Sequence, residues 1–235
     1  MKTKAANRLI VALDAADLPS AVRMAKRLQG VVRYVKIGSI LFTAEGPQAV
    51  RRLRRMGFEV FLDLKFHDIP STVGHSCQAA VRHGVWMLTV HASGQSDMLN
   101  AAATAVRREA RRLRIRRPLV VGVTVLTSVD GATPASMKSR VVALAREAKR
   151  AGLDGVVCSV HEARAVRRRF GQTFTVVCPG IRAAGSEAAD QRRVATPAAA
   201  LRQGASFLVV GRPITQAADP RRAAQQMLDD MEDGC

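Results

Sequence analysis

The amino-acid sequence predicts an α/β protein with the (β/α)8 TIM-barrel architecture, built as a single domain over residues 1–235. Short apolar runs rich in β-branched residues recur at intervals of roughly 25 to 35 residues, and an amphipathic segment follows each of them. Strands that alternate with helices in this way form a parallel sheet, because each helix carries the chain back to start the next strand. Eight such units in a chain of this length fit one closed barrel.

The eight apolar runs have the composition of strands that are buried on both faces. This composition is typical of a parallel sheet covered by helices. In chain order we expect strands at residues 9–14, 34–38, 59–66, 87–91, 119–126, 155–160, 174–178 and 207–211.

The segments between these runs repeat their apolar residues with the period of an α-helix. We expect helices at residues 18–28, 46–56, 72–83, 97–114, 136–151, 160–170, 196–203 and 219–231. Side chains that cap helix N-termini stand at the expected starts, and glycines follow several expected ends. The candidate caps are Asp17, Ser71 or Thr72, Ser96, Ser136 and Thr196, and the glycines are Gly30, Gly57, Gly84, Gly152 and Gly204.

An open, doubly wound sheet is the alternative arrangement of the same elements. The turn after the first expected strand, residues 14–17, reads Asp-Ala-Ala-Asp and lacks the glycine-rich fingerprint of dinucleotide-binding sheets. Eight evenly spaced units also close naturally, which favours the barrel.

The composition and the apolar runs favour a globular protein over a membrane-spanning one. With 48% hydrophobic and 24% charged residues, the chain can bury a core, and its apolar runs are shorter than the roughly 18 to 20 residues of a membrane span. Residues 1–4 are basic, but no signal-peptide apolar core follows them. We therefore expect a cytoplasmic protein with no membrane partner.

The cysteines and histidines show no metal-binding spacing. Cys77, Cys158, Cys178 and Cys235 form no C-x-x-C pair, and the five histidines form no H-x-x-x-H pair. We expect reduced, packed thiols and no zinc site.

The charge is strongly basic, with 37 Lys and Arg against 19 Asp and Glu, a net charge of +18. The basic residues are dispersed over all the expected helices, without the interleaved aromatic residues of a base-stacking surface. A solvated, arginine-rich surface is therefore favoured over a specific nucleic-acid site, although non-specific adhesion to polyanions at low salt is expected. A non-enzymatic nucleic-acid-binding barrel remains the alternative from another functional class.

Charged residues gather at the ends of the first three expected strands, which in a barrel form the active face. Asp14 ends the first strand, Lys36 lies in the second, and the third carries Asp63 and Lys65, which share one face because side chains alternate along a strand. Asp68 follows three residues later. Lys36, Asp63, Lys65 and Asp68 are thus predicted to surround one cavity. A purely structural ion-pair network is the alternative, but burying four charges is costly, which favours a functional site.

A second group of residues indicates a phosphate site. The last expected strand leads into Gly211 and Arg212, followed by a helix start at residue 213. The segment 179–194 is polar and long enough to be a binding loop or lid. Barrels of this class often hold phosphate in the loops after the seventh and eighth strands, so we expect a substrate with a phosphoryl group.

Several motifs resemble the bacterial type of the orotidine 5′-phosphate decarboxylase family. The resemblance runs from about residue 8 to 221, and its most specific parts are the D-x-K-x-x-D-I-P motif and the G-R-P-I-T motif. The matching segments are 11–14 (VALD), 35–38 (VKIG), 62–70 (LDLKFHDIP), 90–94 (VHASG), 179–182 (PGIR), 185–187 (GSE) with 190–193 (DQRR), and 210–215 (VGRPIT).

The resemblance implies a decarboxylation of orotidine 5′-monophosphate to UMP and CO2, the last step of de novo pyrimidine biosynthesis, without metal or cofactor. It implies that Lys65 donates a proton to C6 of the pyrimidine and that Asp63 lies beside the departing carboxylate. Lys36 would orient Asp63 and bind the ribose, and Asp14 would bind the ribose hydroxyls.

The same resemblance implies a homodimer with active sites near the subunit interface. Asp68 and Thr72 would reach into the partner's site, while Thr127 would lie near the base of the substrate.

Four further residues would bind the substrate. Gln191 would bridge base and phosphate, Arg212 and the backbone of Gly211 would grip the phosphate, and Arg182 belongs to the substrate-binding set. The chain departs from the family pattern at Gln95, where a second glycine is common.

Magnesium-dependent sugar-phosphate decarboxylases and aldolases of the same superfamily are the closer rival, since they share the D-x-K-x-x-D motif. They place a metal-binding glutamate near the end of the second strand, where this sequence has Lys36. A lysine disfavours a divalent cation at that position. We therefore expect neither a metal nor a cofactor.

Overall fold

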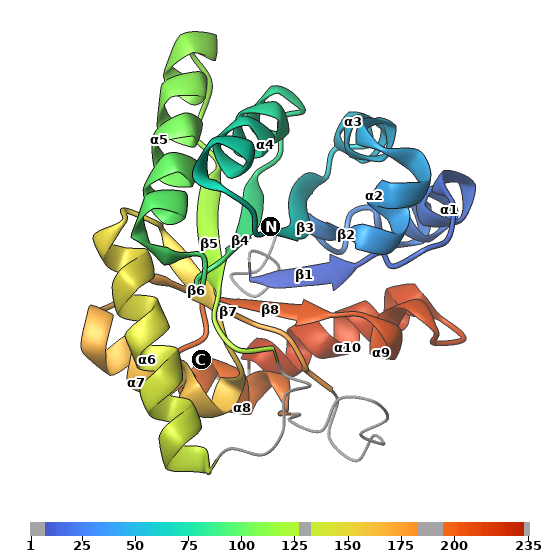
Figure 1. Cartoon of the computed structure of the whole chain (residues 1–235). Helices are drawn as coiled ribbons and strands as arrows, with labels where there is room; N and C mark the ends of the chain where they lie inside the picture. Colours follow the sequence, from blue (N-terminus) through green and yellow to red (C-terminus); the bar gives the residue numbers. More distant parts are fainter. Residues whose placement is uncertain (1–7, 127–132, 183–194, 233–235) are drawn as a thin grey trace.

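Eight parallel strands form a closed barrel in which each strand pairs with the next and the last pairs with the first, confirming the predicted fold (Figure 1). The computed structural model describes residues 8–126, 133–182 and 195–232. The strands are β1 (Leu9–Ala12), β2 (Tyr34–Gly38), β3 (Glu59–Phe66), β4 (Met87–His91), β5 (Leu119–Val123), β6 (Gly155–Val157), β7 (Thr175–Cys178) and β8 (Phe207–Val210).

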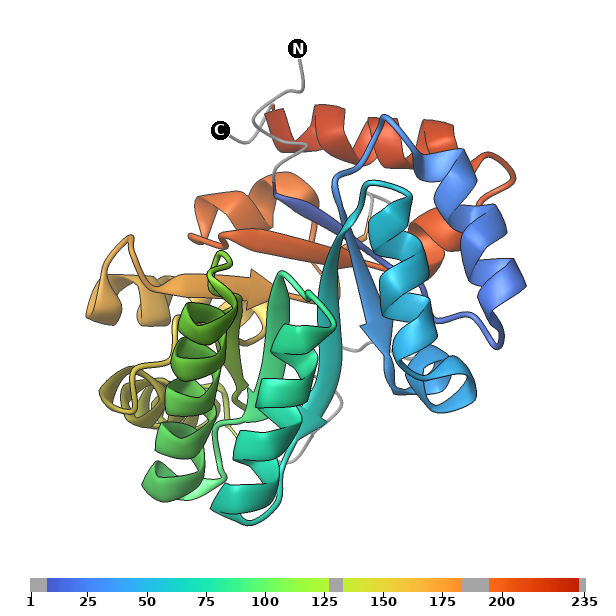
Figure 2. The same ribbon diagram turned by 90° about the horizontal axis from the view of Figure 1, so that it is seen from above.

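Helices cover the outside of the strands, as Figures 1 and 2 show from two directions. Among the described residues they are α1 (Leu18–Leu28), α2 (Ser39–Glu45), α3 (Pro47–Arg55), α4 (Pro70–Arg82), α5 (Gln95–Leu113), α6 (Pro134–Arg150), α7 (Val160–Phe170), α8 (Pro197–Arg202), α9 (Arg212–Thr215) and α10 (Pro220–Glu232).

Helix α2 was not predicted, because it follows β2 directly and is only 7 residues long. Of its residues only Leu41 is buried, so it shows no apolar period that could be recognised in the sequence. Gly46, at φ 59°, separates α2 from α3.

Two of the predicted N-caps are confirmed. Asp17 accepts a hydrogen bond from the backbone N–H of Ser20 (2.7 Å), and Thr196 accepts one from Ala199 (3.3 Å). Both helices begin at the residue that the cap predicts or one residue later.

The other predicted N-caps, Ser71 or Thr72, Ser96 and Ser136, are wrong. Their helices begin one or two residues earlier, at Pro70, Gln95 and Pro134. For α4 and α6 the reason is proline, whose fixed φ suits the first helical position. The true cap of α6 is Thr133, which accepts a hydrogen bond from the backbone N–H of Ser136 (3.2 Å).

The barrel has two apolar layers, one on each side of the strands. Outward side chains pack against the helices, and inward ones form a separate cluster inside the barrel. At the end where the strands begin, the interior is filled by aromatic rings: the centroid of Trp86 lies 4.1 Å from that of Tyr34 and 5.0 Å from that of Phe207. Inside the barrel, space for polar side chains is therefore left at the opposite end, where the strands finish.

The buried thiols agree with the predicted reduced state. Cys77, Cys158 and Cys178 are free and buried, and burial raises the pKa of Cys77 to about 12. Cys235 lies outside the described residues. In the described part of the chain no helix has the length and hydropathy needed to span a membrane.

Helices α4 and α5 are joined by a buried carboxylate. The side chain of Glu109 on α5 is 1% exposed and accepts hydrogen bonds from Arg112 (2.6 and 3.0 Å), Arg82 (2.7 Å) and Gln78 (2.8 Å). The hydrogen bonds of Arg112, then those of Arg82 and Gln78, hold the pKa of Glu109 far below its ordinary value of 4.5.

Glu109→Gln is expected to lower the thermal midpoint at pH 7 by several degrees, and this difference should shrink as the pH falls from 5 to 3. The folded pKa is depressed, so the stabilisation is complete above the unfolded pKa near 4.5 and is lost as the pH falls below it. Melting curves of the two proteins across this range measure the effect. Glu147→Gln is the control, because its pair with Arg150 is exposed and should contribute little at any pH. A difference that does not vary with pH would contradict this account.

Candidate active site

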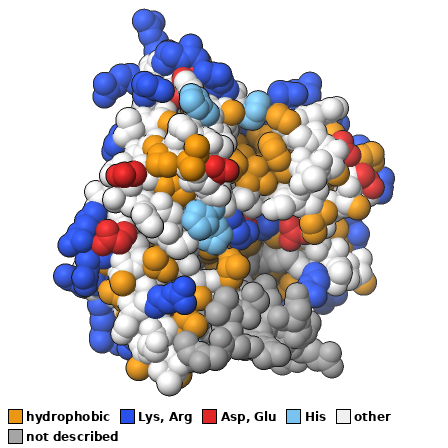
Figure 3. All heavy atoms as spheres, viewed as in Figure 1, with side chains coloured by type: hydrophobic (Ala, Val, Ile, Leu, Met, Phe, Trp, Pro, Cys, Tyr) orange, Lys and Arg blue, Asp and Glu red, His pale blue; other side chains and the backbone are white. Residues whose placement is uncertain are grey.

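A cavity of about 520 Å³ opens at the end of the barrel where the strands finish, and we call it the mouth cavity. This volume is in the range of small-molecule sites. Its lining includes charged side chains from the ends of β1, β2 and β3, valines of β5, β6 and β8, and arginines that follow β7 and β8. In the space-filling view, basic, acidic and histidine side chains meet at a hollow in the middle of the visible face (Figure 3).

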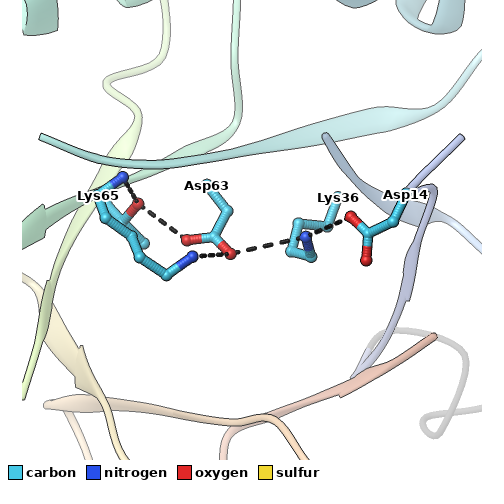
Figure 4. A network of polar contacts seen from close by, with 5 residues as sticks. Asp14, Lys36, Asp63 and Lys65 are labelled. Atoms are coloured by element: carbon cyan, nitrogen blue, oxygen red, sulfur yellow. Dashed lines mark hydrogen bonds and ion pairs between the residues drawn. The ribbon is translucent and has the colours of Figure 1, made fainter. Parts of the chain in front are cut away.

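Four charged side chains alternate in sign along one wall of the mouth cavity (Figure 4). Lys36 Nζ lies 3.0 Å from Asp14 Oδ1 and 3.6 Å from Asp63 Oδ2. The same Asp63 oxygen accepts a hydrogen bond from Lys65 Nζ at 2.9 Å. The side chains of Lys36 and Asp63 are only 11% and 13% exposed, whereas that of Lys65, at 36%, is open to the cavity. We call Asp14, Lys36, Asp63 and Lys65 the charged row.

The alternation of β3 places Asp63 and Lys65 in the mouth cavity, as predicted. Leu62, Leu64 and Phe66 instead belong to the outer layer that packs against the helices. The pairing of β3 with β4 shifts register between Leu62 and Phe66, and Lys65 lies in this irregular stretch with φ 52°. Such a left-handed conformation is costly for a residue other than glycine and persists only where the surroundings impose it.

Thr89 on β4 is the residue that holds this irregular stretch, and the sequence analysis missed it. It is completely buried, and its hydroxyl donates to Asp63 Oδ1 (3.0 Å) while accepting from the backbone N–H of Lys65 (2.8 Å). One hydroxyl thus fixes both the orientation of Asp63 and the backbone of Lys65. Threonine is common in strands, so nothing in the sequence distinguished it.

Gly38 at the end of β2 leaves the space in which Lys36 and Asp14 form their ion pair. A Cβ atom at this position would lie 2.9 Å from Lys36 Nζ and 3.0 Å from Asp14 Oδ1. Any larger residue would therefore push against the ion pair between these two side chains.

The structure does not bring Asp68 into the mouth cavity of its own chain, which corrects the predicted set of four charges. Asp68 is exposed, and its Oδ1 accepts a hydrogen bond from the backbone N–H of Ile69 (2.6 Å). The chain leaves the barrel after Phe66 and turns into α4, so Asp68 and the exposed Thr72 lie outside the barrel mouth. Asp14 is the fourth member of the row instead.

The mouth cavity also holds the predicted phosphate residues and a predicted substrate-binding arginine. Gly211, Arg212 and Arg182 all line it, and Arg212 begins the short helix α9. The Nε of Arg182 is buried and has no hydrogen-bond partner among the described residues. Predicted site residues Thr127 and Gln191 lie outside the described residues.

Two histidines that the sequence analysis did not assign to the site lie next to Lys65. The ring centroids of His67 and His91 are 5.1 Å apart. Burial, then the charges of His67 and Lys65, lower the pKa of His91 below its ordinary value. Gln95, the first residue of α5, has φ 63°, which explains why glycine suits this position.

Comparisons with known proteins agree with the geometry. The family model described as "Orotidine 5'-phosphate decarboxylase / HUMPS family" matches residues 7–227. The chain is 48% identical over 239 residues to the orotidine 5′-phosphate decarboxylase of Moorella thermoacetica, covering 99% of this chain and 95% of that protein. It is 50% identical over 223 residues to that of Halorhodospira halophila, covering 92% of each.

A solved structure shows the same fold over nearly the same length. The crystal structure of orotidine 5′-phosphate decarboxylase from Lactobacillus acidophilus superimposes with a TM-score of 0.84 at 33% sequence identity, covering 96% of this chain and 99% of that one. The family match, the two relatives and the barrel geometry agree with one another. The chain belongs to the orotidine 5′-phosphate decarboxylase / HUMPS family.

Proposed function

We propose that this chain converts orotidine 5′-monophosphate to UMP and CO2, the last step of de novo pyrimidine biosynthesis, in the cytoplasm and without metal or cofactor. The observation that carries the proposal is the charged row, which lies in a cavity that Arg182 and Arg212, after β7 and β8, also line. A nucleotide offers a reacting base at one end and a phosphate at the other, which matches this distribution. The buried free thiols are typical of proteins in a reducing compartment.

The substrate orientation follows from the charges that line the mouth cavity. Arg212, the backbone of Gly211 and Arg182 bind the phosphate, since guanidinium groups suit phosphate oxygens. Asp14 and Lys36 bind the ribose hydroxyls. Thr127 contacts the base, and Gln191 bridges base and phosphate.

The charged row then performs the chemistry at C6 of the pyrimidine. When the bond from C6 to the carboxylate breaks, its electron pair stays in an sp² orbital that no adjacent π system can accept. The ammonium of Lys65 stabilises this localised carbanion and transfers a proton to C6, while CO2 leaves. No oxidant or reductant is needed, because the electron pair of the broken bond becomes that of the new C–H bond.

Asp63 contributes through its charge and through its position. Its carboxylate is 2.9 Å from Lys65 Nζ, so a substrate placed against Lys65 brings its own carboxylate close to Asp63. The repulsion is relieved as CO2 departs, which favours the transition state over the bound substrate. Phosphate binding is remote from the breaking bond, and its binding energy holds the reacting end against this repulsion.

The position of Lys36 favours the metal-free reaction over that of the magnesium-dependent sugar-phosphate decarboxylases and aldolases. Its ammonium already lies between two carboxylates, 3.0 Å from Asp14 and 3.6 Å from Asp63, where it would repel a divalent cation.

The decisive experiment is the loss of orotidine 5′-monophosphate absorbance in excess chelator. We expect the same turnover rate before and after dialysis against EDTA, with no increase when Mg²⁺ is added back. Turnover that disappears on dialysis and returns with Mg²⁺ would contradict the metal-free reaction. A chain that never consumes this substrate would contradict the function itself.

We also propose that the chain forms a homodimer in which Asp68 and Thr72 complete the partner's site. Both residues are exposed and lie outside the mouth cavity of their own chain. The side chain between them, Ile69, is 63% exposed, and Ile40 is 60% exposed. Burial of these two apolar side chains against a partner subunit would be favourable.

Mixing two inactive variants tests the shared site. Lys65→Ala and Asp68→Ala each remove one component, but a mixed dimer contains one site with both Lys65 and Asp68 intact. After subunit exchange in an equal mixture, we expect the activity to return to about one quarter of the wild-type value, because half of the dimers are mixed and half of their sites are complete. A mixture that stays as inactive as its components would contradict the shared site.

A further inference from the structure

A second cavity, of about 560 Å³, lies at the opposite end of the barrel, where the strands begin. Its lining comes from the residues that precede β1 and β8 and from α7 and α8, so it shares no residue with the mouth cavity. We call it the base cavity. Five arginines line it: Arg8, Arg164, Arg167, Arg168 and Arg202.

Two of these arginines form a fixed floor. Arg167 donates to the carbonyl oxygen of Gly204 (3.0 and 2.7 Å) and to the hydroxyl of Ser206 (2.7 Å), and it also donates to three carbonyl oxygens at the end of α7 and the start of β7. Arg8 donates to the carbonyl oxygens of Ser206 (3.2 Å) and Ala205. These bonds hold both guanidinium groups in place before any ligand arrives.

The described lining of the base cavity is basic. Among the described residues that line the base cavity there is no Asp or Glu. Burial, and then the charge of Arg8, lower the pKa of Arg167. The two cations therefore repel each other in the folded chain. A bound anion would relieve this repulsion.

The other three arginines form an exposed rim. Arg164 and Arg168 lie four residues apart on α7 and therefore project from the same face, while Arg202 ends α8. Within the described part of the chain none of the three is paired with a carboxylate. Elsewhere the chain does pair its arginines, for example Arg117 with Asp154.

We propose that the base cavity binds a small polyanion with at least two linked phosphoryl groups, such as a nucleoside triphosphate or inorganic tripolyphosphate. Three separate rim guanidinium groups around one cavity match several phosphoryl groups better than a single one, and each can bind phosphate oxygens in bidentate fashion. The fixed floor adds a favourable potential at no further ordering cost. A cavity of this size holds a small molecule, whereas a nucleic-acid duplex would contact only its rim.

Calorimetric titration with tripolyphosphate at physiological ionic strength tests the proposal. In the variant Arg164→Gln, Arg168→Gln, Arg202→Gln we expect the affinity to fall by at least about 10-fold, because three charged contacts are lost. Basic side chains appear in several separate parts of the visible face, so a control matched in charge is needed (Figure 3). The variant Arg52→Gln, Arg146→Gln, Arg169→Gln removes three exposed arginines that do not line the base cavity and should bind within about 2-fold of the wild type.

Three outcomes would overturn the proposal. An equal loss in both triple variants would show adhesion driven by net charge. A loss in Arg212→Gln, with the base-cavity variant unaffected, would place tripolyphosphate in the mouth cavity. A single-stranded oligonucleotide that binds more tightly than tripolyphosphate, and loses affinity in the base-cavity triple variant, would show a nucleic-acid surface instead.

Melting curves check that the triple variant is folded. If it does not fold, the single variants Arg164→Gln and Arg202→Gln replace it, and each is expected to lose about 3-fold in affinity for tripolyphosphate.

Discussion

Replacement of Lys65 by alanine is expected to reduce the release of CO2 from orotidine 5′-monophosphate by at least about 10³-fold, because the cation that stabilises the carbanion and the proton donor are lost together. Affinity for UMP should change by no more than a few fold, since Arg212 and Arg182, which also line the mouth cavity, are untouched. Substrate absorbance measures the first quantity and calorimetry the second.

The matched control is Lys26→Ala, which removes an exposed lysine on α1 that does not line the mouth cavity. It should leave turnover unchanged. Lys65→Arg separates the two roles of Lys65, because a guanidinium keeps the positive charge but does not release a proton in proteins. We expect Lys65→Arg to remain nearly inactive. Near-normal turnover in Lys65→Ala would contradict the assignment of Lys65, and high turnover in Lys65→Arg would show that charge alone is sufficient.

The strands and the charged row could be predicted because they depend on local patterns. Apolar runs bounded by turns located all eight strands, and alternation along β3 placed Asp63 and Lys65 on one face. The ends of the strands were less accurate. The strand expected at 155–160 ends at Val157, because the Ser159 hydroxyl accepts a hydrogen bond from the N–H of His161 and starts α7 directly after it.

What the sequence could not predict depends on contacts between distant segments. The side of the barrel mouth on which Asp68 falls is decided by the turn from β3 into α4, and no residue pattern encodes that turn. The role of Thr89 depends on the pairing between β3 and β4. Its hydroxyl bonds to Asp63, which lies 26 residues away in the sequence. Alternation shows only that Thr89 lies on the same face of β4 as Met87, which points into the barrel.

Thr89→Val is expected to reduce kcat by about 10- to 100-fold while leaving KM for orotidine 5′-monophosphate nearly unchanged. Valine has the same shape but lacks the hydroxyl, so Asp63 Oδ1 loses its donor and the N–H of Lys65 loses its acceptor. Asp63 can then rotate, and the left-handed backbone at Lys65 can relax, which moves the ammonium away from C6. The phosphate residues do not contact Thr89, so binding is expected to survive.

Thr89→Ser and Thr124→Val distinguish a positioning role from a structural one. Serine keeps the hydroxyl and should restore most of kcat. Thr124 on the chain after β5 is also buried, with a hydroxyl that donates to the carbonyl of Val157 (2.8 Å), but it does not line the mouth cavity. Thr89→Val should lose about 1–3 kcal/mol of stability, because it leaves the buried N–H of Lys65 without an acceptor. Thr124→Val should lose less, because the carbonyl of Val157 still accepts a hydrogen bond from the backbone N–H of Thr124 (3.1 Å). If kcat falls equally in both, or in neither, Thr89 only stabilises the barrel. A fall in Thr89→Val alone, reversed by serine, ties kcat to the one hydroxyl that joins Asp63 to the backbone of Lys65.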